Sequence, residues 1–220
     1  MPEESDMIKV SVIDYGMGNM RSVSRALEHC GAKVEITSEP SAILGADRVV
    51  LPGVGAFVAG MSALKHRELD EVVRKVAGAG TPLLGICLGM QMLMEESEEF
   101  GLTLGLGLIQ GRVVEIPAST PAGQLLKRPH IGWNELLLPS HGKTWEGSLL
   151  EDTPVGDAMY FVHSFMADPT LPEDRLADCL YGGIPIAATI KHDNVMGCQF
   201  HPEKSGASGL EILRAFLRRP

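Results

Sequence analysis

The chain has 220 residues, and 45% of them are hydrophobic, which is enough to build one large domain with a substantial core. Its 28 acidic residues outnumber its 19 lysines and arginines and give a net charge of −9, which repels phosphate backbones and anionic lipid headgroups. These numbers exclude a small disulfide-stapled scaffold and disfavour binding to nucleic acid or to a membrane surface.

Metal-binding and targeting patterns are missing from the sequence. The four cysteines form no C-x-x-C pair, and the seven histidines form no H-x-H or H-E-x-x-H pattern, so we expect free thiols and no metal. The N-terminal MPEESDMIKV is acidic where a signal peptide would be basic. The apolar stretch from Pro82 to Met94 is well short of the ~20 residues that span a membrane. We therefore expect a cytoplasmic protein.

The first hundred residues predict strands that alternate with helices. Apolar, β-branched runs predict strands at residues 8–13, 33–37, 48–51 and 82–86, and helices are predicted at residues 20–30, 69–77 and 88–96. Elements alternating at this spacing form a parallel sheet that is covered by helices on both faces.

Beyond Gly101 the apolar runs are separated by turn-rich pieces instead of helices. GRVVEI, LLKRPHIGWNELLL, AMYFVHSF and IPIAATI predict antiparallel strands, KHDN at 191–194 predicts a hairpin turn before the strand VMGCQF, and residues 209–218 predict a final helix. No repeat or long linker divides the chain. We predict one α/β domain over residues 1–220, with a central, mostly parallel sheet and an antiparallel extension.

The sharpest local feature is GICLG at residues 85–89, placed where an apolar strand meets a helix. Small residues two positions to each side of Cys87 permit the tight turn of a nucleophile elbow, with Cys in place of Ser. A helix that begins at Leu88 would direct its free N–H groups and positive dipole end at the sulfur and favour the thiolate. A buried core cysteine is the alternative, and the flanking glycines favour the nucleophile.

His201-Pro202-Glu203 supplies the base that a cysteine nucleophile needs. Pro202 favours extended backbone at His201, and positions two apart in an extended segment face the same side. Glu203 can therefore hold the imidazole in one tautomer, as the third member of a catalytic triad does. Alone, H-P-E would more often be a surface turn, and it gains its weight from the elbow cysteine.

Two glycine-containing loops follow predicted strands. Gly53 and Gly55 of the loop PGVG permit peptide orientations that other residues resist, so this loop and the N–H of Leu88 could stabilise an oxyanion. A simple strand-to-helix turn is the alternative. The loop DYGMGN at 14–19 resembles half of a dinucleotide-binding fingerprint, but Arg21 stands where the third glycine is needed, which argues against NAD.

Two further residues have ordinary structural explanations. Trp133 in HIGWNEL fits a partly buried aromatic residue of a strand, and His163 in YFVHSF fits a hydrogen-bonded core histidine. Their spacing alone favours no other role.

PGVG, GICLGMQ and QFHPEKSG together resemble the class I, or triad, glutamine amidotransferases. This resemblance implies a flavodoxin-like α/β fold and an enzyme that hydrolyses the side-chain amide of glutamine and passes ammonia to a synthase. With IDYGMGNMRSV, LPGVGAF, PHIGWNEL and YFVHSF, the sequence is most similar to the glutaminase subunits of imidazole glycerol phosphate synthase, in histidine biosynthesis. The similarity runs from about Val10 to Gly206.

The resemblance also implies a role for particular residues. Cys87, His201 and Glu203 would form the triad: the thiolate attacks the carboxamide, His201 protonates departing ammonia, and water then hydrolyses the thioester. The oxyanion hole would comprise Gly53, Val54 and Leu88, and glutamine would bind to Gly55, Gln91, Glu99 and the backbone of Ser164 and Phe165. Asn19, Trp133, Tyr160 and Lys204 would lie near the partner surface.

The implied partner is the cyclase subunit, a (β/α)₈ barrel that receives the ammonia within a heterodimer. No cofactor or metal is implied. Three alternatives remain: an amidotransferase subunit that serves anthranilate, pyridoxal phosphate or purine synthesis, a free-standing Cys-dependent hydrolase or peptidase, and a non-catalytic subunit. GWNEL and DYGMGN argue against the first, and the complete Cys, His and Glu set argues against the last.

Overall fold

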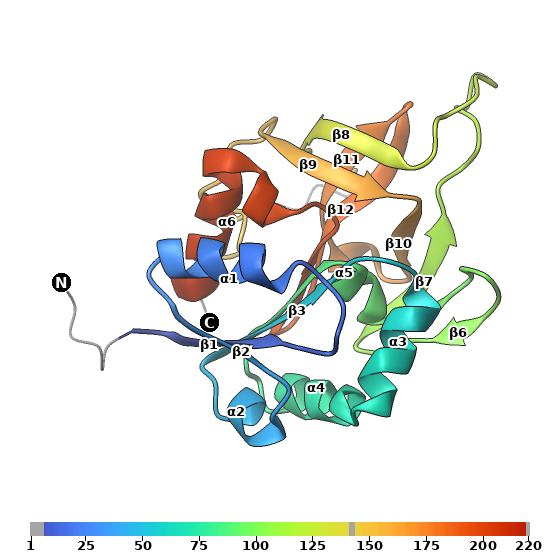
Figure 1. Ribbon diagram of the computed structural model, residues 1–220. Helices are drawn as coiled ribbons and strands as arrows, with labels where there is room; N and C mark the ends of the chain where they lie inside the picture. Colours follow the sequence, from blue (N-terminus) through green and yellow to red (C-terminus); the bar gives the residue numbers. More distant parts are fainter. Residues whose placement is uncertain (1–6, 141–143, 219–220) are drawn as a thin grey trace.

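The structure, a computed structural model, describes residues 7–140 and 144–218. Its central sheet contains β1 (Lys9–Ile13), β2 (Lys33–Thr37), β3 (Arg48–Gly53), β4 (Leu83–Cys87), β11 (Arg175–Tyr181), β12 (Ile184–His192) and β13 (Val195–Cys198). The strand order is β11-β12-β13-β4-β3-β1-β2 (Figure 1). Strands β13 to β2 are parallel, and β12 and β11 extend them antiparallel. This confirms the predicted α/β sheet and its antiparallel extension.

Helices cover both faces of this sheet. They are α1 (Met20–His29), α2 (Pro40–Leu44), α3 (Phe57–His66), α4 (Leu69–Gly78), α5 (Leu88–Met92) and α6 (Gly206–Arg218), with 3-10 turns η2 (Pro172–Asp174) and η3 (Pro202–Lys204). Helices α1 and α6 lie on one side, and α2 and α4 lie on the other (Figure 1). In α4 the buried residues Leu69, Val72, Val73 and Val76 recur at helical spacing, which gives the helix one apolar face.

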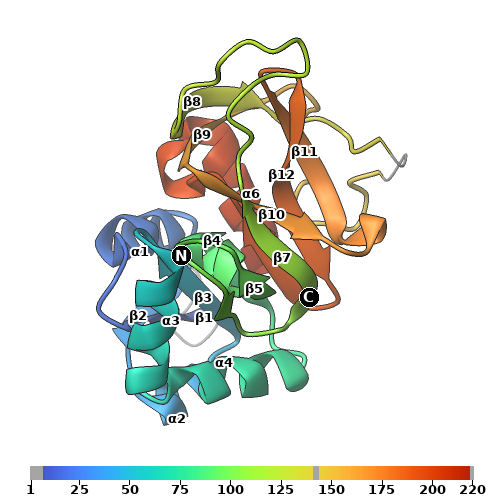
Figure 2. The ribbon, with the colours of Figure 1, turned by 90° about the vertical axis from the view of Figure 1, so that its right-hand side faces the viewer.

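A smaller sheet and a ribbon complete the fold. The smaller sheet contains β5 (Met94–Ser97), β6 (Thr103–Leu104), β7 (Ile109–Glu115) and β10 (Phe165–Pro169), in the order β10-β7-β5-β6. The ribbon pairs β8 (His130–Glu135) with β9 (Ala158–His163). Figure 2 shows the ribbon at the end of the molecule opposite α2 and α4.

The structure differs from the predicted elements in three places. The helix predicted at 88–96 ends at Met92, because Met94–Ser97 pairs with β7 and becomes a strand. AMYFVHSF is split at Ser164: β9 pairs with β8, whereas β10 pairs with β7. Helices α2 and α3 were not predicted, although Phe57, Gly60, Met61 and Leu64 are buried at helical spacing in α3.

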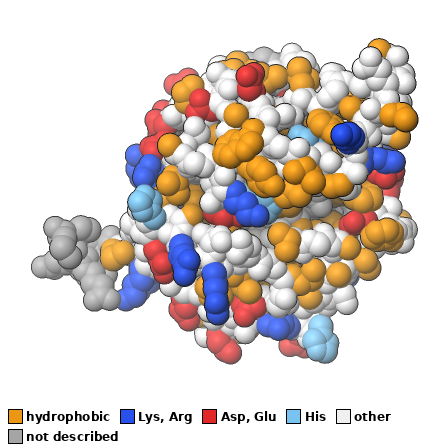
Figure 3. Space-filling model, turned by 45° about the horizontal axis from the view of Figure 1, so that its top comes forward, with side chains coloured by type: hydrophobic (Ala, Val, Ile, Leu, Met, Phe, Trp, Pro, Cys, Tyr) orange, Lys and Arg blue, Asp and Glu red, His pale blue; other side chains and the backbone are white. Residues whose placement is uncertain are grey.

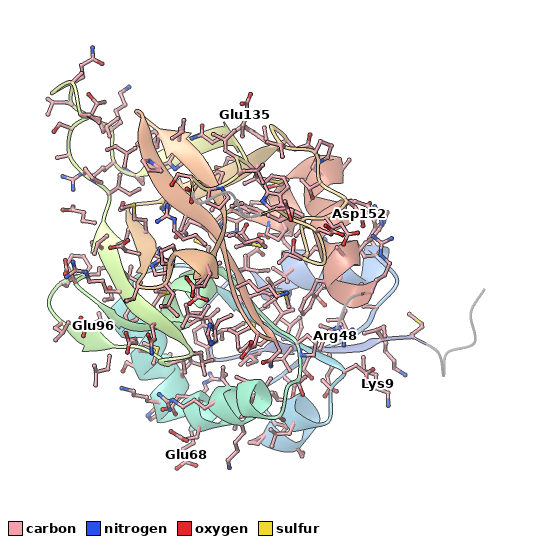
Figure 4. The ribbon with its side chains drawn as sticks, turned by 180° about the vertical axis from the view of Figure 1, so that it is seen from behind. Lys9, Arg48, Glu68, Glu96, Glu135 and Asp152 are labelled. Atoms are coloured by element: carbon pink, nitrogen blue, oxygen red, sulfur yellow. The ribbon has the colours of Figure 1, made fainter. Side chains whose placement is uncertain are left out.

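Several of the acidic side chains that make the net charge negative lie on the outer surface. Glu68, Glu135 and Asp152 are exposed and point outward from separate parts of the fold (Figure 4). None of the described helices is long and apolar enough to cross a membrane. Residues 1–6, which carry most of the argument against an export signal, lie outside the described residues.

Candidate active site

Cys87 sits on a sharp turn between β4 and α5. Its φ of +54° lies in the left-handed region, which residues other than glycine rarely adopt. A Cβ on Gly85 would lie 2.7 Å from backbone atoms of Gly89, and a Cβ on Gly89 would lie 1.8 Å from the carbonyl oxygen of Leu51. Both positions therefore require glycine, and the turn has the geometry of a nucleophile elbow.

The sheet order brings the elbow next to the other predicted site segments. Strand β4 lies between β3 and β13 and runs parallel to both. Gly53 at the end of β3 pairs with Cys87, and β13 ends at Cys198, shortly before His201. In open α/β sheets, ligands bind beyond the carboxyl ends of the strands. Cys87, the PGVG loop and the H-P-E segment therefore meet at one edge of the sheet.

His201 and Glu203 form a buried pair. The Nδ1 of His201 lies 2.9 Å from Oε1 of Glu203, and the two side chains are 3% and 1% exposed. The carboxylate only accepts, so Nδ1 carries a proton and Nε2 is left for other chemistry. Burial lowers the pKa of His201, but its interactions with an ionised Cys87 and with Glu203 outweigh burial and raise it to about 9.

A cleft of about 370 Å³ opens beside the elbow. It is lined by Val54, Gly55, Cys87, Leu88, Gln91, Glu99, Pro129, Val162, His163, Ser164, Phe165 and His201. The structure thus brings together nearly all of the predicted triad, oxyanion and substrate residues. Two of them lie behind the lining: Gly53 packs against α5, and Glu203 stands behind His201.

Two polar side chains of the cleft are held by backbone groups. Glu99 accepts a hydrogen bond from the N–H of Phe57, the first residue of α3, at 2.6 Å. Gln91 donates from Nε2 to the carbonyl oxygen of Phe165 at 2.9 Å. A carboxylate and an amide oxygen fixed in this way can bind the ammonium group of an amino acid.

The PGVG loop is braced by the loop at residues 14–19. Tyr15 is buried and donates from its hydroxyl to the carbonyl oxygen of Pro52 at 2.6 Å. Gly18 lies against Gly53, where an added Cβ would meet backbone atoms at 3.5 Å. Leu88 opens α5, so its N–H has no partner within the helix. The loop that resembles half of a nucleotide fingerprint therefore supports the cleft from outside.

His163 lines the cleft and is linked to a second buried histidine. Its Nδ1 donates to the carbonyl oxygen of Phe165 at 2.8 Å, so its Nε2 must accept from Nδ1 of His130, 2.9 Å away. Burial lowers the pKa of His163 to about 3 and that of His130 to about 4, so both are neutral at physiological pH. The core-histidine interpretation of His163 is correct in its hydrogen bonding, but no sequence motif pointed to its place in the cleft.

Three of the four predicted partner-surface residues lie together. Trp133 on β8 is 55% exposed, and its ring centroid lies 6.0 Å from that of Tyr160 on β9. The Nζ of Lys204 lies 5.9 Å above the Tyr160 ring. Asn19 is exposed just before α1. Ile131, two residues before Trp133 on the same strand, is also exposed, so this ribbon presents apolar side chains to solvent. Figure 3 shows that hydrophobic side chains gather at this end of the molecule.

Within residues 7–140 and 144–218, no three His, Cys, Asp or Glu side chains lie together as a metal site would require.

Residues 11–219 match the class-I glutamine amidotransferases, and the chain belongs to this family. Imidazole glycerol phosphate synthase subunit HisH 1 of Legionella pneumophila (strain Lens) is 52% identical over 212 residues, which cover 96% of this chain and 100% of that protein. Subunit HisH of Methanosarcina mazei is 47% identical over 213 residues, or 96% of this chain and 98% of that protein. Within the family, the chain is thus one of the HisH subunits.

The fold is shared more widely than the sequence. The structure of PurLQS from Thermotoga maritima superimposes with a TM-score of 0.70 and covers 96% of this chain and 98% of that chain. The two sequences are only 18% identical, so this likeness concerns the architecture alone.

Proposed function

We propose that this chain is the glutaminase of an imidazole glycerol phosphate synthase and converts glutamine to glutamate and ammonia through a thioester on Cys87. The observation that carries the proposal is the meeting of the strained elbow cysteine with the buried His201–Glu203 pair in one cleft. The relatives that are about half identical over the whole chain support the same activity.

Glutamine would bind with its amino acid end against Gln91 and Glu99 and its carboxamide over Cys87. The carboxylate of Glu99 and the Oε1 of Gln91 would accept from the ammonium group. The backbone of Ser164 and Phe165 and the small residue Gly55 line the same cleft and would complete the pocket.

The first half of the reaction would release ammonia. The thiolate of Cys87 attacks the carboxamide carbon, and the oxygen gains negative charge in the tetrahedral intermediate. The N–H of Leu88 and the Gly53–Val54 peptide donate to that oxygen, a contribution worth on the order of 3 kcal/mol for each donor. His201, kept protonated by its neighbours, gives its Nε2 proton to the departing nitrogen.

The second half would regenerate the enzyme. Neutral His201 takes a proton from water at Nε2, and the resulting hydroxide attacks the thioester carbon. The bond to sulfur breaks, glutamate leaves, and Cys87 returns to the thiolate beside the imidazolium. Glu203 holds Nδ1 in the donor state throughout, so the same nitrogen serves as acid and then as base.

The ammonia would pass to a cyclase subunit, a (β/α)₈ barrel, within a cytoplasmic heterodimer. The apolar face with Trp133, Tyr160 and Lys204, together with Asn19, would form the docking surface. We assign the whole of residues 1–220 to one glutaminase domain, because both core clusters pack on the same central sheet. The exposed Val54 would let the partner influence the oxyanion peptide.

Glutamate release by the complex with the cyclase tests this proposal. Cys87→Ala should lower glutaminase activity by at least about a thousandfold, whereas product formation from added ammonium salts persists. Cys179→Ala removes another buried cysteine on β11 and should retain both activities. Loss of ammonium-dependent synthesis in Cys87→Ala would make Cys87 structural. We expect the chain alone to release little glutamate, because the partner would act on the oxyanion peptide through the exposed Val54. Full glutaminase activity without the cyclase would refute this dependence on the partner.

A further inference from the structure

We infer that Gln199 is a positioning residue of this site, because its side-chain amide holds Gln91 on one side and donates a hydrogen bond to the sulfur of Cys87 on the other. The inference rests on the proposed glutaminase function and adds a residue to it. Gln199 follows β13, two residues before His201, and is completely buried.

The backbone of Phe165 fixes the orientation of both amides. Its carbonyl oxygen can only accept, so the group of Gln91 that lies 2.9 Å away must be Nε2. The same Nε2 lies 3.0 Å from Gln199 and must donate there to Oε1. The Nε2 of Gln199 therefore points the other way, where it lies 3.7 Å from the sulfur of Cys87.

The contact with Gln199 favours the ionised form of Cys87. The sulfur also lies 3.9 Å from the carbonyl oxygen of Val162, which a thiol could donate to but a thiolate could not. The amide N–H of Gln199 does the opposite, because it can only donate and so interacts best with the negative sulfur. Gln199 is also neutral, so its donation does not change when His201 gains or loses a proton.

The titratable groups that face Cys87 act differently from Gln199. An ionised Cys87 and Glu203 both raise the pKa of His201, but His201 is itself a reactant, because it transfers protons in both half-reactions of the proposed mechanism. Burial and an ionised Cys87 both raise the pKa of Tyr15, so Tyr15 stays neutral. In the described part of the chain, Gln199 is thus a permanent donor to the nucleophile that does not take part in proton transfer.

Gln199 also determines what Gln91 can offer a substrate. Both hydrogens of Gln91 Nε2 are used, one by Phe165 and one by Gln199. The remaining polar atom of Gln91 is Oε1, which can only accept and therefore suits an ammonium group. Without Gln199, one hydrogen of Gln91 Nε2 loses its acceptor, and only the hydrogen bond to Phe165 still orients the Gln91 amide. A single buried amide thereby couples substrate binding to the nucleophile.

Two variants separate these roles. Gln199→Glu keeps an oxygen for Gln91 but removes the donor to Cys87, whereas Gln199→Met has a similar size and removes both contacts. The control is Gln110→Met, the same Gln-to-Met substitution at an exposed position of β7. The readouts are kcat and KM for glutamine in the complex with the cyclase, and the rate at which iodoacetamide alkylates Cys87 of the full chain, resolved by mass spectrometry.

Gln199→Glu should slow alkylation of Cys87 at neutral pH by about tenfold, lower kcat by about tenfold and leave KM within about twofold. Gln199→Met should also raise KM by about tenfold, and Gln110→Met should match the wild type. Wild-type alkylation profiles and KM values in both Gln199 variants would overturn the inference.

A measurement on the unaltered protein guards against variants that fail to fold. The side-chain amide resonances of Gln199 should shift with pH together with the ionisation of Cys87, and amide resonances that do not respond would also overturn the inference. Neither alkylation nor the amide resonances require turnover. Failure of the proposed function would instead appear as a wild-type complex that releases no glutamate.

Discussion

Replacing Glu203 with glutamine removes one charge from the buried His201–Glu203 pair and preserves its shape. The Oε1 of Glu203 lies 2.9 Å from Nδ1 of His201, and the side chains are 1% and 3% exposed, so solvent screens the interaction little. A hydrogen bond to a charged group contributes about 1.5–3 kcal/mol, and ~1.4 kcal/mol corresponds to one unit of pKa. The pKa of His201 should therefore fall from about 9 by roughly one to two units.

The glutaminase rate of Glu203→Gln should fall by more than the lower pKa of His201 alone would cause. Loss of the carboxylate weakens imidazolium formation by about tenfold to a hundredfold. A glutamine amide can also donate to Nδ1 and thereby select the wrong tautomer, an effect that costs up to about 10⁴ in a Ser-His-Asp triad. We expect kcat for glutamine to drop between about 10² and 10⁴, with KM little changed because Glu203 stands behind the cleft.

The assay is glutamate release by the complex over a range of pH, with ammonium-dependent synthesis as the measure of integrity and NMR titration of the His201 ring. Glu68→Gln makes the same change at an exposed site before α4 and should leave all three readouts unchanged. A Glu203→Gln enzyme with kcat within about twofold of the wild type, or with an unshifted His201 titration, would refute the assigned role of Glu203.

Three further outcomes follow from the geometry. Gly89→Ala would place Cβ 1.8 Å from the carbonyl oxygen of Leu51 and should lower the free energy of unfolding by about 3 kcal/mol or more, as measured by urea unfolding. Gly78→Ala adds a Cβ in open space, so the same measurement should find it neutral or stabilising. Glu99→Gln should raise KM for glutamine by roughly tenfold or more in steady-state kinetics, with a smaller effect on kcat, because it loses the charge beside the substrate's ammonium. The pKa of His201 is raised from 6.5 to about 9, so the protonated imidazole stabilises the folded protein fully below pH 6.5, and this stabilisation is lost as pH rises through 9. The difference in free energy of unfolding between wild type and His201→Asn should therefore shrink from pH 6.5 to pH 9. A constant difference would contradict the raised pKa of His201.

Much of the fold was predictable because local signals agreed with the tertiary structure. The predicted strand at 33–37 is β2 without change, and the predicted helix at 69–77 differs from α4 by one residue. The helix predicted at 88–96 was too long, and this error shows what local sequence signals cannot predict. Leu88 to Met92 do form a helix, but residues 94–97 pair with strand β7, which lies more than ten residues farther along the chain. Helical composition cannot reveal a long-range partner of this kind.

The candidate site was predictable where its chemistry is compressed into short motifs. GICLG encodes the elbow because Gly85 and Gly89 are needed within five residues, and H-P-E places a base beside its carboxylate in three. His130 and Gln199 had no such signal. Their partners, His163 and Gln91, lie 33 and 108 residues away, so only the folded sheet reveals the contacts.

The antiparallel extension explains how distant motifs come to share one cleft. A simple βαβ sheet would place successive strands side by side, but β13 follows more than a hundred residues after β4 and still pairs with it. Strands β11 and β12 make this possible, because the hairpin from β12 into β13 reverses the chain and leaves β13 parallel to β4. The segment after β13 then emerges at the same edge as the elbow, carrying Gln199 toward the sulfur and His201 to the cleft wall. Because the end of β13 carries both Gln199 and His201, a shift of β13 along β4 would displace both residues from Cys87 at once. The Gly197–Gly85 pairing that sets this register is therefore as necessary to the proposed active site as the side chains that it positions.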